Sequence, residues 1–463
     1  MRSRRFGITA RLAGGIGSVL SAVFAFAEES AAPPAIDAMY VITSAELPPV
    51  GAASGSVKLG GLSDLFIERT AGRSNDAVTF GIRLWAITDR GPNGTVKTAH
   101  GKRRTLVAPE FVPRIVRFDA APLSAKQPEA LTLAATAFLP LLTASGKPTS
   151  GRPNGVGRDE PILDHATQEP LPADPNGLDP EGLVVSSDGS FWIAEEYRPS
   201  LAHVTADGRV LTRLVPEGQG IPNADMAVEQ VFPAAYGLRK DNRGFESLSI
   251  LGVGGRLVAM LQSPLQTGDG KAGKRTGNVR MIVIDTASKR PVAEHVYRAG
   301  DPTNSAYATC GCPPDDVKIC AMAAIDDRTL LVIEQGDDGS ARLYAAAVSG
   351  ATDTLPRSRQ ADGPPLEEIA DLAAAGITPV HKRLVADLGP LGARFRADAQ
   401  LGVDAPLKLE GIALLDDRRV AIINDDDFAI HGESSASAGP RTCLWVVRLG
   451  APVPTHAALT LDR

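Results

Sequence analysis

The sequence predicts an all-β fold, a β-propeller of six or seven four-stranded blades within a single domain. Short apolar strand pairs recur along the chain, and a polar turn joins the two strands of each pair. Turn-forming residues are abundant, with 46 Gly and 35 Pro among 463 residues, whereas patterns typical of long helices are scarce. Because 43% of the residues are apolar, the chain can bury the large core that such a domain needs.

The clearest strand pair lies between residues 177 and 198 and contains a Ser-Asp-Gly turn. Glu181 stands at the head of the first strand, and Glu195 and Glu196 stand at the end of the second. A hairpin returns its chain to the same edge, so these three carboxylates should gather at one rim. Further strands near 203–204 and 209–215 complete a four-stranded unit of the size of a propeller blade.

The same device recurs later in the chain, where Glu246 and Glu410 head apolar strands as Glu181 does. Asp64 and Asp89 mark a looser copy with a longer connection, and the copy that starts at Met322 has no head acid. The expected strands are, in order, 39–44, 60–67, 82–89, 114–118, 244–251, 255–262, 322–325, 329–334, 409–415, 420–427 and 443–448. We expect strand 443–448 to share a blade with the N-terminal strand, 366–375 to form an amphipathic helix, and 143–178 to form a long lid or binding loop.

The N-terminus has the pattern of a secretory signal peptide over residues 1–27. A basic start precedes an apolar stretch over 12–27, which ends in the small-x-small sequence Ala25-Phe26-Ala27. No second apolar run reaches the roughly 18 residues that a membrane span needs. The mature domain is therefore expected to comprise residues 28–463 and to be periplasmic or secreted.

Charge and cysteine content restrict the partners and the covalent chemistry. The net charge is −6, from 54 acidic and 48 basic residues without a dense basic patch, so we expect no nucleic-acid partner. Nothing indicates an obligate partner chain, so we expect a monomer. In an oxidising compartment Cys310 or Cys312 is expected to pair with Cys320, while Cys443 leaves other pairings open. A zinc site is the weaker alternative, because neither a second Cys-x-x-Cys pair nor a nearby His is present.

Several short motifs resemble the phytase-like family, which is named for the esterase-like activity of phytase. The motifs keep the family's order over most of residues 50–450 and are Asp89–Asn93, Asp179–Gly182, Glu195–Arg198, Gly244–Leu248, Gln262–Leu265, Glu334-Gln335, Leu409–Ile412 and Asn424–Phe428. The resemblance implies an exported β-propeller that hydrolyses phosphate or other esters. Two departures stand out, since the family often has Arg at the position of Gln335 and Asn at the position of Asp426. The first removes a cation that could bind phosphate, and the second adds charge that favours a metal.

Acids at matching strand ends of a propeller converge at one mouth of its central channel. Like charges raise each other's pKa unless a cation neutralises them, and carboxylate, amide and carbonyl oxygens suit Ca²⁺. We therefore expect Ca²⁺ to be held by Asp89, Glu334, Glu410, Asn424, Asp425, Asp426 and Asp427. The expected catalytic residues are Glu181, Glu195, Glu196, Tyr197 and Glu246, and an anionic small-molecule ester is expected to contact Arg90, Asn93, Arg198 and Gln262.

Three functions are compatible with this pattern. The first is calcium-dependent hydrolysis of a phosphoric ester, and the second is hydrolysis of another ester, such as a lactone, with one catalytic metal. The third is a non-enzymatic propeller that binds a ligand and uses Ca²⁺ for stability, since acids at strand ends are often solvated turn residues. The Gly-x-Ser-x-Gly elbow, the Walker motif and the dinucleotide fingerprint are all missing from the sequence.

Overall fold

The computed structural model describes residues 32–50, 57–74, 77–99, 101–120, 130–157, 159–252, 255–300, 317–336, 339–429 and 440–457. All of them belong to one compact unit, Ala32–Arg463. The expected signal peptide, Cys310 and Cys312 lie outside the described residues.

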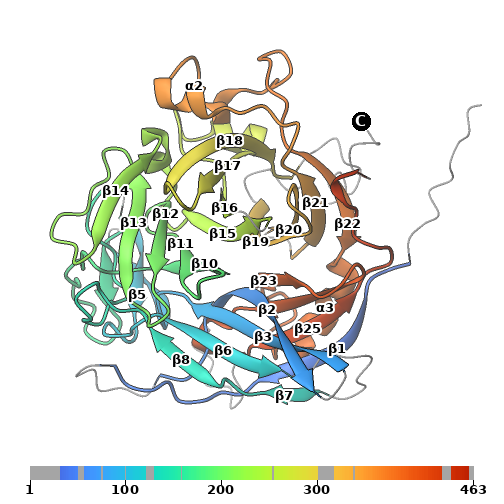
Figure 1. The fold of residues 1–463 in the computed structure, drawn as a ribbon. Coiled ribbons are helices and arrows are strands. Elements are labelled where there is room, and N and C mark those ends of the chain that lie inside the picture. Colours follow the sequence, from blue (N-terminus) through green and yellow to red (C-terminus); the bar gives the residue numbers. More distant parts are fainter. Residues whose placement is uncertain are drawn as a thin grey trace, which may run out of the picture. The chain divides into compact units, whose positions relative to one another are not determined.

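The fold is all-β, with strands numbered to β25 and only short helices (Figure 1). Four sheets follow one another along the chain between residues 62 and 387. Within each of them, strands that neighbour each other in the sheet follow the order of the chain. The first contains β2 (Leu62–Ser74), β3 (Ala77–Thr88), β6 (Arg114–Ala120) and β8 (Ala137–Pro140). The second contains β10 (Pro180–Val185), β11 (Phe191–Glu195), β12 (Ser200–Val204), β13 (Val210–Pro216) and β14 (Ala227–Phe232). The next two contain β15 (Phe245–Leu251), β16 (Arg256–Leu261), β17 (Asn278–Asp285) and β18 (Arg290–Arg298), and then β19 (Val317–Ala324), β20 (Thr329–Gly336), β21 (Ala341–Ala347) and β22 (His381–Asp387).

The fifth sheet joins the two ends of the described chain. It contains β23 (Leu409–Leu414), β24 (Arg419–Asn424), β25 (Cys443–Arg448), β1 (Ala35–Ile42) and β7 (Leu131–Leu133). Strands β1 and β25 pair antiparallel, which confirms the prediction that the last strand shares a sheet with the N-terminal strand. A smaller sheet of β4 (Asn93–Thr98), β5 (Gly101–Leu106) and β9 (Ile162–Asp164) stands apart from these five.

The first strands of the five sheets lie side by side around a common centre, in the order β2, β10, β15, β19 and β23, with β23 again next to β2 (Figure 1). This is the arrangement of propeller blades. The prediction of six or seven four-stranded blades is not confirmed, because the described residues form five sheets of four or five strands. Outside these five sheets, described segments form the β4–β5–β9 sheet and the helical insertion between β21 and β22.

Neighbouring inner strands approach closely, and Gly182 and Gly411 make this possible. A Cβ atom on Gly411 would lie 2.7 Å from the backbone nitrogen of Leu65, and one on Gly182 would lie 2.9 Å from the backbone nitrogen of Leu248. The glycine after Glu181 and after Glu410 is therefore required by the packing of one inner strand on the next.

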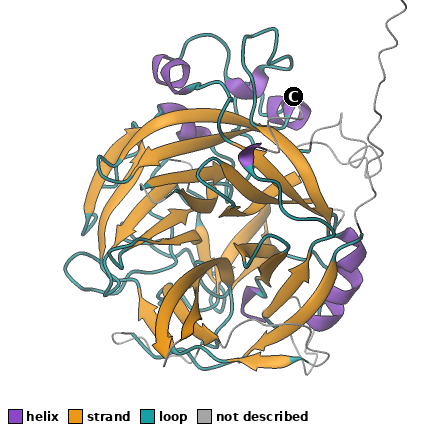
Figure 2. Cartoon of the chain, turned by 45° about the vertical axis from the view of Figure 1, so that its right-hand side comes forward, coloured by secondary structure: helices purple, strands orange, loops and turns teal. Residues whose placement is uncertain are grey.

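Helices are short and lie outside the strands (Figure 2). The described ones are α1 (Ala272–Thr276), α2 (Leu355–Gln360), α3 (Gly392–Asp398), η1 (Ala234–Leu238), η3 (Leu366–Glu368), η4 (Gly389–Leu391) and η5 (Asp427–Ala429). The predicted helix over 366–375 is wrong, because only η3 forms there and turns follow it. Its apolar residues pack on Val296 from these turns, so burial did not require a helix. Within the described ranges no helix is long and apolar enough to cross a membrane.

Candidate functional site

A β-bulge interrupts each of the five inner strands at the same point. In β10, Pro180 lies opposite Glu195 and Gly182 lies opposite Ala194, so Glu181 is an extra residue without a partner. The equivalent extra residues in β2, β15, β19 and β23 are Ser63, Glu246, Cys320 and Glu410. A bulge kinks its strand and changes the direction of a side chain. The head acids Glu181, Glu246 and Glu410 are therefore bulge residues, whereas Asp64 directly follows the bulge of β2.

The neighbouring second strands contribute an equivalent set of residues. In the second sheet this residue is Glu196, which directly follows the pairing partner of Pro180. Its counterparts in the other sheets are Asp89, Gln262, Gln335 and Asp425. These five residues and the bulge residues of β10, β15, β19 and β23 line one pocket of about 270 Å³. The site is therefore built from the same two positions in each sheet.

Most of the predicted site residues line this pocket. They are Asp89, Arg90, Asn93, Glu181, Glu196, Glu246, Gln262, Glu410, Asp425 and Asp427. The predicted residues that do not line it are Glu195, Tyr197, Arg198, Glu334, Asn424 and Asp426.

Glu195 is fully buried and supports the turn that carries Glu196. Its carboxylate contacts the Arg213 guanidinium at 2.6 Å and accepts a hydrogen bond from the Ser200 hydroxyl at 3.0 Å. It also accepts hydrogen bonds from the backbone N–H groups of Asp179, Tyr197 and Arg198. These contacts use both carboxylate oxygens inside the protein, so Glu195 belongs to the scaffold.

Glu334 and Asn424 occupy the positions equivalent to Glu195 and are also held inside. Glu334 accepts a hydrogen bond from the Tyr297 hydroxyl and pairs with Lys382. The side-chain oxygen of Asn424 accepts a hydrogen bond from the backbone of Cys443 at 2.8 Å. Because successive side chains of a strand point to opposite faces, the following residue is the one that reaches the pocket.

Tyr197, Arg198 and Asp426 have internal partners as well. The Tyr197 hydroxyl donates to the carbonyl of Gly151, so it is not placed to orient a leaving group in the pocket. Arg198 pairs with Asp159 at 3.1 Å. The Asp426 carboxylate accepts hydrogen bonds from backbone N–H groups of Gly61 at 3.0 Å and Phe428 at 3.1 Å. Of the two arginines expected to contact an anionic ester, Arg90 therefore lines the pocket and Arg198 does not.

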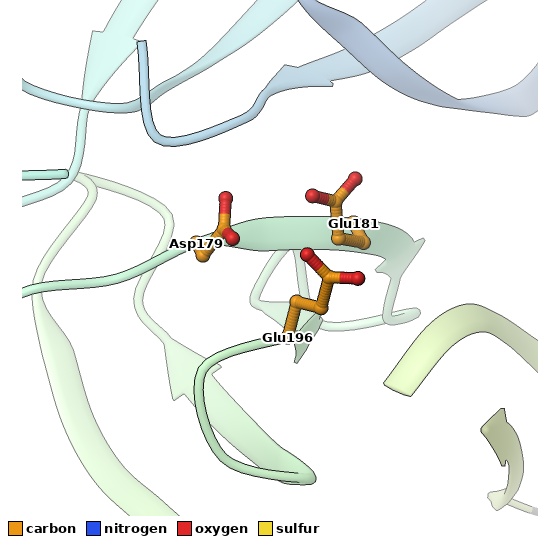
Figure 3. Close-up of side chains that lie close together, drawn as sticks. All are labelled: Asp179, Glu181 and Glu196. Atoms are coloured by element: carbon orange, nitrogen blue, oxygen red, sulfur yellow. The ribbon is translucent and has the colours of Figure 1, made fainter. Parts of the chain in front are cut away.

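Three carboxylates offer oxygens within 4.8 Å of one another, from Asp179, Glu181 and Glu196 (Figure 3). Arg90 pairs with Asp179 and contacts Glu196 Oε2 at 2.9 Å. The other oxygen of Glu196, Oε1, and Oε2 of Glu246 are buried and accept no hydrogen bond from the described part of the protein. This side of the pocket therefore has carboxylate oxygens that could hold a metal ion.

Burial changes the proton affinity of these acids. It raises the pKa of Glu181 well above its ordinary value, and Asp179 and Glu246 add to the effect by repulsion. Burial likewise raises the pKa of Glu246, followed by the nearby charge of Glu196. The pKa of Asp89 is raised by burial and then by Asp425 and Asp179. Without a cation, burial and mutual repulsion therefore favour the protonated forms of these carboxyls.

A layer of apolar side chains lies two residues beyond the bulges on the same face of the inner strands. Its members are Leu65, Leu183, Leu248, Met322 and Ile412, all of which are buried. They line a second cavity of about 430 Å³. The acids of the pocket therefore stand above an apolar layer, which keeps the local dielectric low and contributes to their raised pKa values.

The sequence reasoning missed four of the five described basic residues that line the pocket, since only Arg90 was expected there. Arg104, Arg243, Lys318 and Lys408 all line it, together with Asn242. Two of them share a position that could have identified them, since Lys318 and Lys408 each stand two residues before a bulge residue, Cys320 and Glu410 respectively. The predicted lid does not take part, since no described residue of 143–178 lines the pocket.

The expected disulfide of Cys320 is wrong, because Cys320 and Cys443 are both free and buried. Cys320 occupies the bulge of β19, where other sheets carry an acid, and it lines the pocket. The expectation failed because β19 begins at Val317, upstream of the predicted strand start at Met322, and so includes Cys320. Burial raises the pKa of its thiol, so the thiol remains protonated at neutral pH.

Comparisons with known proteins give the following likenesses. A family model described as Phytase-like, esterase-like activity of phytase, matches residues 58–428. An uncharacterized secreted protein of Arthroderma benhamiae is 30% identical over 134 residues, so the match spans about a quarter of that relative's length, 26% of each chain. A PQQ-bound aldose sugar dehydrogenase of Streptomyces coelicolor has a TM-score of 0.31 at 10% identity and covers 90% of this chain and 100% of that one. A luciferin-regenerating enzyme has a TM-score of 0.29 at 9% identity and covers 79% of this chain and 87% of that one. At such low TM-scores these two structures say nothing of the activity of this chain.

Proposed function

Because this chain belongs to the phytase-like family, we propose that it is an exported hydrolase of a phosphoric or other ester that acts at the acidic pocket. The observation that carries the proposal is the pair of buried carboxylate oxygens, Glu196 Oε1 and Glu246 Oε2, that accept no hydrogen bond within the described structure. Buried charges without partners are costly, so a cation from solution is the natural partner for them.

The donor set fits Ca²⁺, a hard cation that takes 6–8 oxygen ligands. Glu181 and Glu196, which offer oxygens within 4.8 Å of each other, would hold the ion, and Glu246 lines the same pocket. A bound Ca²⁺ would supply Lewis-acid polarisation of an ester oxygen and would make water more acidic. The metal set expected from the sequence is thereby revised, because Glu334, Asn424 and Asp426 are held inside the protein.

The chain's own residues would bind the substrate and move a proton. Arg104, Arg243 and Lys318 line the pocket and would attract an anionic ester. Asp89 also lines it, and one of its oxygens accepts a hydrogen bond from the backbone of Gly91 at 2.7 Å. Burial and then the charge of Asp425 raise the pKa of Asp89 well above its ordinary value, which favours a role as the acid that donates a proton to the leaving oxygen.

We further propose that the protein is exported, as its N-terminal pattern and the name of the Arthroderma benhamiae relative suggest. The proposed form is a monomer, residues 28–463, in the periplasm or outside the cell. It acts on a small-molecule ester and has no nucleic-acid partner.

The test is a panel of phosphate esters, carboxylic esters and lactones, assayed with and without a calcium chelator. We expect turnover of an anionic ester that is lost on chelation and restored by added Ca²⁺. Phosphate release that survives complete chelation would contradict the calcium part of the proposal. Turnover of lactones alone would favour the alternative of a lactonase with one metal. No turnover, with chelation lowering only the melting temperature, would show a ligand-binding propeller with structural Ca²⁺.

A further inference from the structure

Six of the seven described acidic residues that line the pocket, all except Asp89, form two groups that differ in their basic partners. Glu181, Glu196 and Glu246 come from the second and third sheets, and we call them the glutamate group. The second group, from the fifth sheet, comprises Glu410, Asp425 and Asp427 and is called here the β23–β24 group.

Lys408 supplies a fixed positive charge to the β23–β24 group. Its ammonium pairs with Asp425 and with Asp427 and lies 3.9 Å from Glu410. The carbonyl of Lys408 also accepts a hydrogen bond from the backbone N–H of Asp425 at 2.9 Å. The lysine is therefore attached to this group through both its backbone and its side chain.

The backbone after β24 adopts an unusual conformation that returns Asp427 to this lysine. Three successive residues other than glycine have left-handed backbones, with φ of 45° at Asp427, 55° at Phe428 and 59° at Ala429. Such residues cost free energy and persist where surrounding contacts enforce them. Here the Asp425 carboxylate accepts a hydrogen bond from the backbone N–H of Asp427 at 2.7 Å. The turn therefore fixes two carboxylates around one ammonium.

The glutamate group lacks a comparable ammonium among the described residues. Arg90 contacts only Oε2 of Glu196, at 2.9 Å, and its second partner in the cluster is Asp179. Oε1 of Glu196 and Oε2 of Glu246 are buried, line the pocket and accept no hydrogen bond. Lys408 thus supplies a positive charge from the protein to one half of the pocket, whereas the other half has carboxylate oxygens that accept no hydrogen bond from the described residues.

We infer that the pocket binds a single divalent cation, at the glutamate group, and that the Lys408 ammonium takes the place of a second cation at the β23–β24 group. A tethered ammonium competes with any free ion at high effective concentration, so Asp425 and Asp427 are closed to metal. The inference rests on the proposed function, because it assumes that the acidic pocket binds Ca²⁺.

The test measures how many equivalents of Ca²⁺ bind to the chelator-treated full chain, by isothermal titration calorimetry and equilibrium dialysis. We expect one equivalent for the wild type and none for the Glu181→Gln/Glu196→Gln double variant. Lys408→Met keeps the length of the side chain but removes its charge, and should raise the number to two. Lys318→Met is the matched control, since it also removes a pocket lysine two residues before a bulge, and should leave the number at one.

The outcomes separate this inference from the proposed function. Zero equivalents in the wild type would refute the calcium site and with it both statements. One equivalent in both the wild type and Lys408→Met, or two in the wild type, would refute only the role given to Lys408. If Lys408→Met does not fold, the double variant Asp425→Asn/Asp427→Asn decides the question. It should still bind one equivalent, and loss of binding would overturn the inference.

Discussion

Replacing the adjacent residues Glu195 and Glu196 by Gln should affect different properties, the stability of the protein for Glu195 and its calcium affinity and activity for Glu196. Glu195 and Arg213 are both completely buried, and their contact distance is 2.6 Å. Removing one partner of a buried ion pair costs about 3–5 kcal/mol, because the other charge remains without compensation. A Gln side chain still accepts some of the hydrogen bonds, so we expect Glu195→Gln to lower the free energy of unfolding by about 3 kcal/mol.

Glu196→Gln removes a pocket carboxylate whose Oε1 accepts no hydrogen bond. Arg90 retains Asp179 as a partner, so the free energy of unfolding should change by less than about 1 kcal/mol. In contrast, loss of a proposed ligand should lower the calcium affinity and the rate of ester hydrolysis by about 10–100-fold or more.

Urea unfolding followed by tryptophan fluorescence gives the stability of both variants, and Ca²⁺ titration and the rate per folded molecule give the function. The reasoning predicts that Glu195→Gln is destabilised but binds Ca²⁺ and reacts within about threefold of the wild type when folded. A Glu195→Gln variant with normal stability and no activity would refute it. Such a result would restore the catalytic role that the sequence suggested for Glu195.

Two further predictions concern the scaffold. Gly411→Ala should lower the free energy of unfolding by about 2 kcal/mol, because the new Cβ would lie 2.7 Å from the backbone nitrogen of Leu65. Gly402→Ala is the control and should be neutral, because a Cβ there would have nothing within 4 Å. Equal melting temperatures for the two variants would contradict the packing argument. Burial raises the pKa of Asp426 to about 7, so between pH 4 and pH 7 the folded protein binds more protons than the unfolded chain and loses up to about 4 kcal/mol of stability as the pH rises. Asp426→Asn keeps an acceptor oxygen but does not titrate. Urea unfolding of both proteins between pH 4 and pH 7 should therefore show the variant becoming more stable relative to the wild type as the pH rises. A stability difference that is independent of pH would show the reasoning to be wrong.

The repeat of the strand pairs was visible in the sequence because its determinants are local. Alternating apolar residues, a turn and a head acid followed by a small residue indicated each hairpin, and the hairpins at Glu181, Glu246 and Glu410 all form. The predicted number of blades is not confirmed, because short apolar runs do not by themselves show how strands are grouped into sheets. Segment 366–375 shows a related ambiguity, since its apolar residues pattern like a helix but are buried largely from turns.

The composition of the pocket was predicted in part. The acids were identified because they recur at matching positions, and those at the bulges, Glu181, Glu246 and Glu410, all line the pocket. At the ends of the second strands the sequence assigned both Glu195 and Glu196, of which only Glu196 lines the pocket, and it assigned Glu334 where Gln335 lines the pocket. Apart from Arg90, the basic residues were missed, because the position that Lys318 and Lys408 share, two residues before a bulge, is recognised only when the strand pairing is known.

The sequence by itself determined the all-β class, the recurring hairpins, the family and the acidic character of the site, because patterns of residues within one hairpin carry all of these. Only the tertiary structure decided which of two adjacent acids reaches the pocket and which is held inside. A bulge adds one residue to the inner strand, and with side chains alternating between two faces, one residue of displacement changes the face. The pairing of Lys408 with Asp425 and Asp427 likewise depends on a left-handed turn that no local sequence pattern predicts.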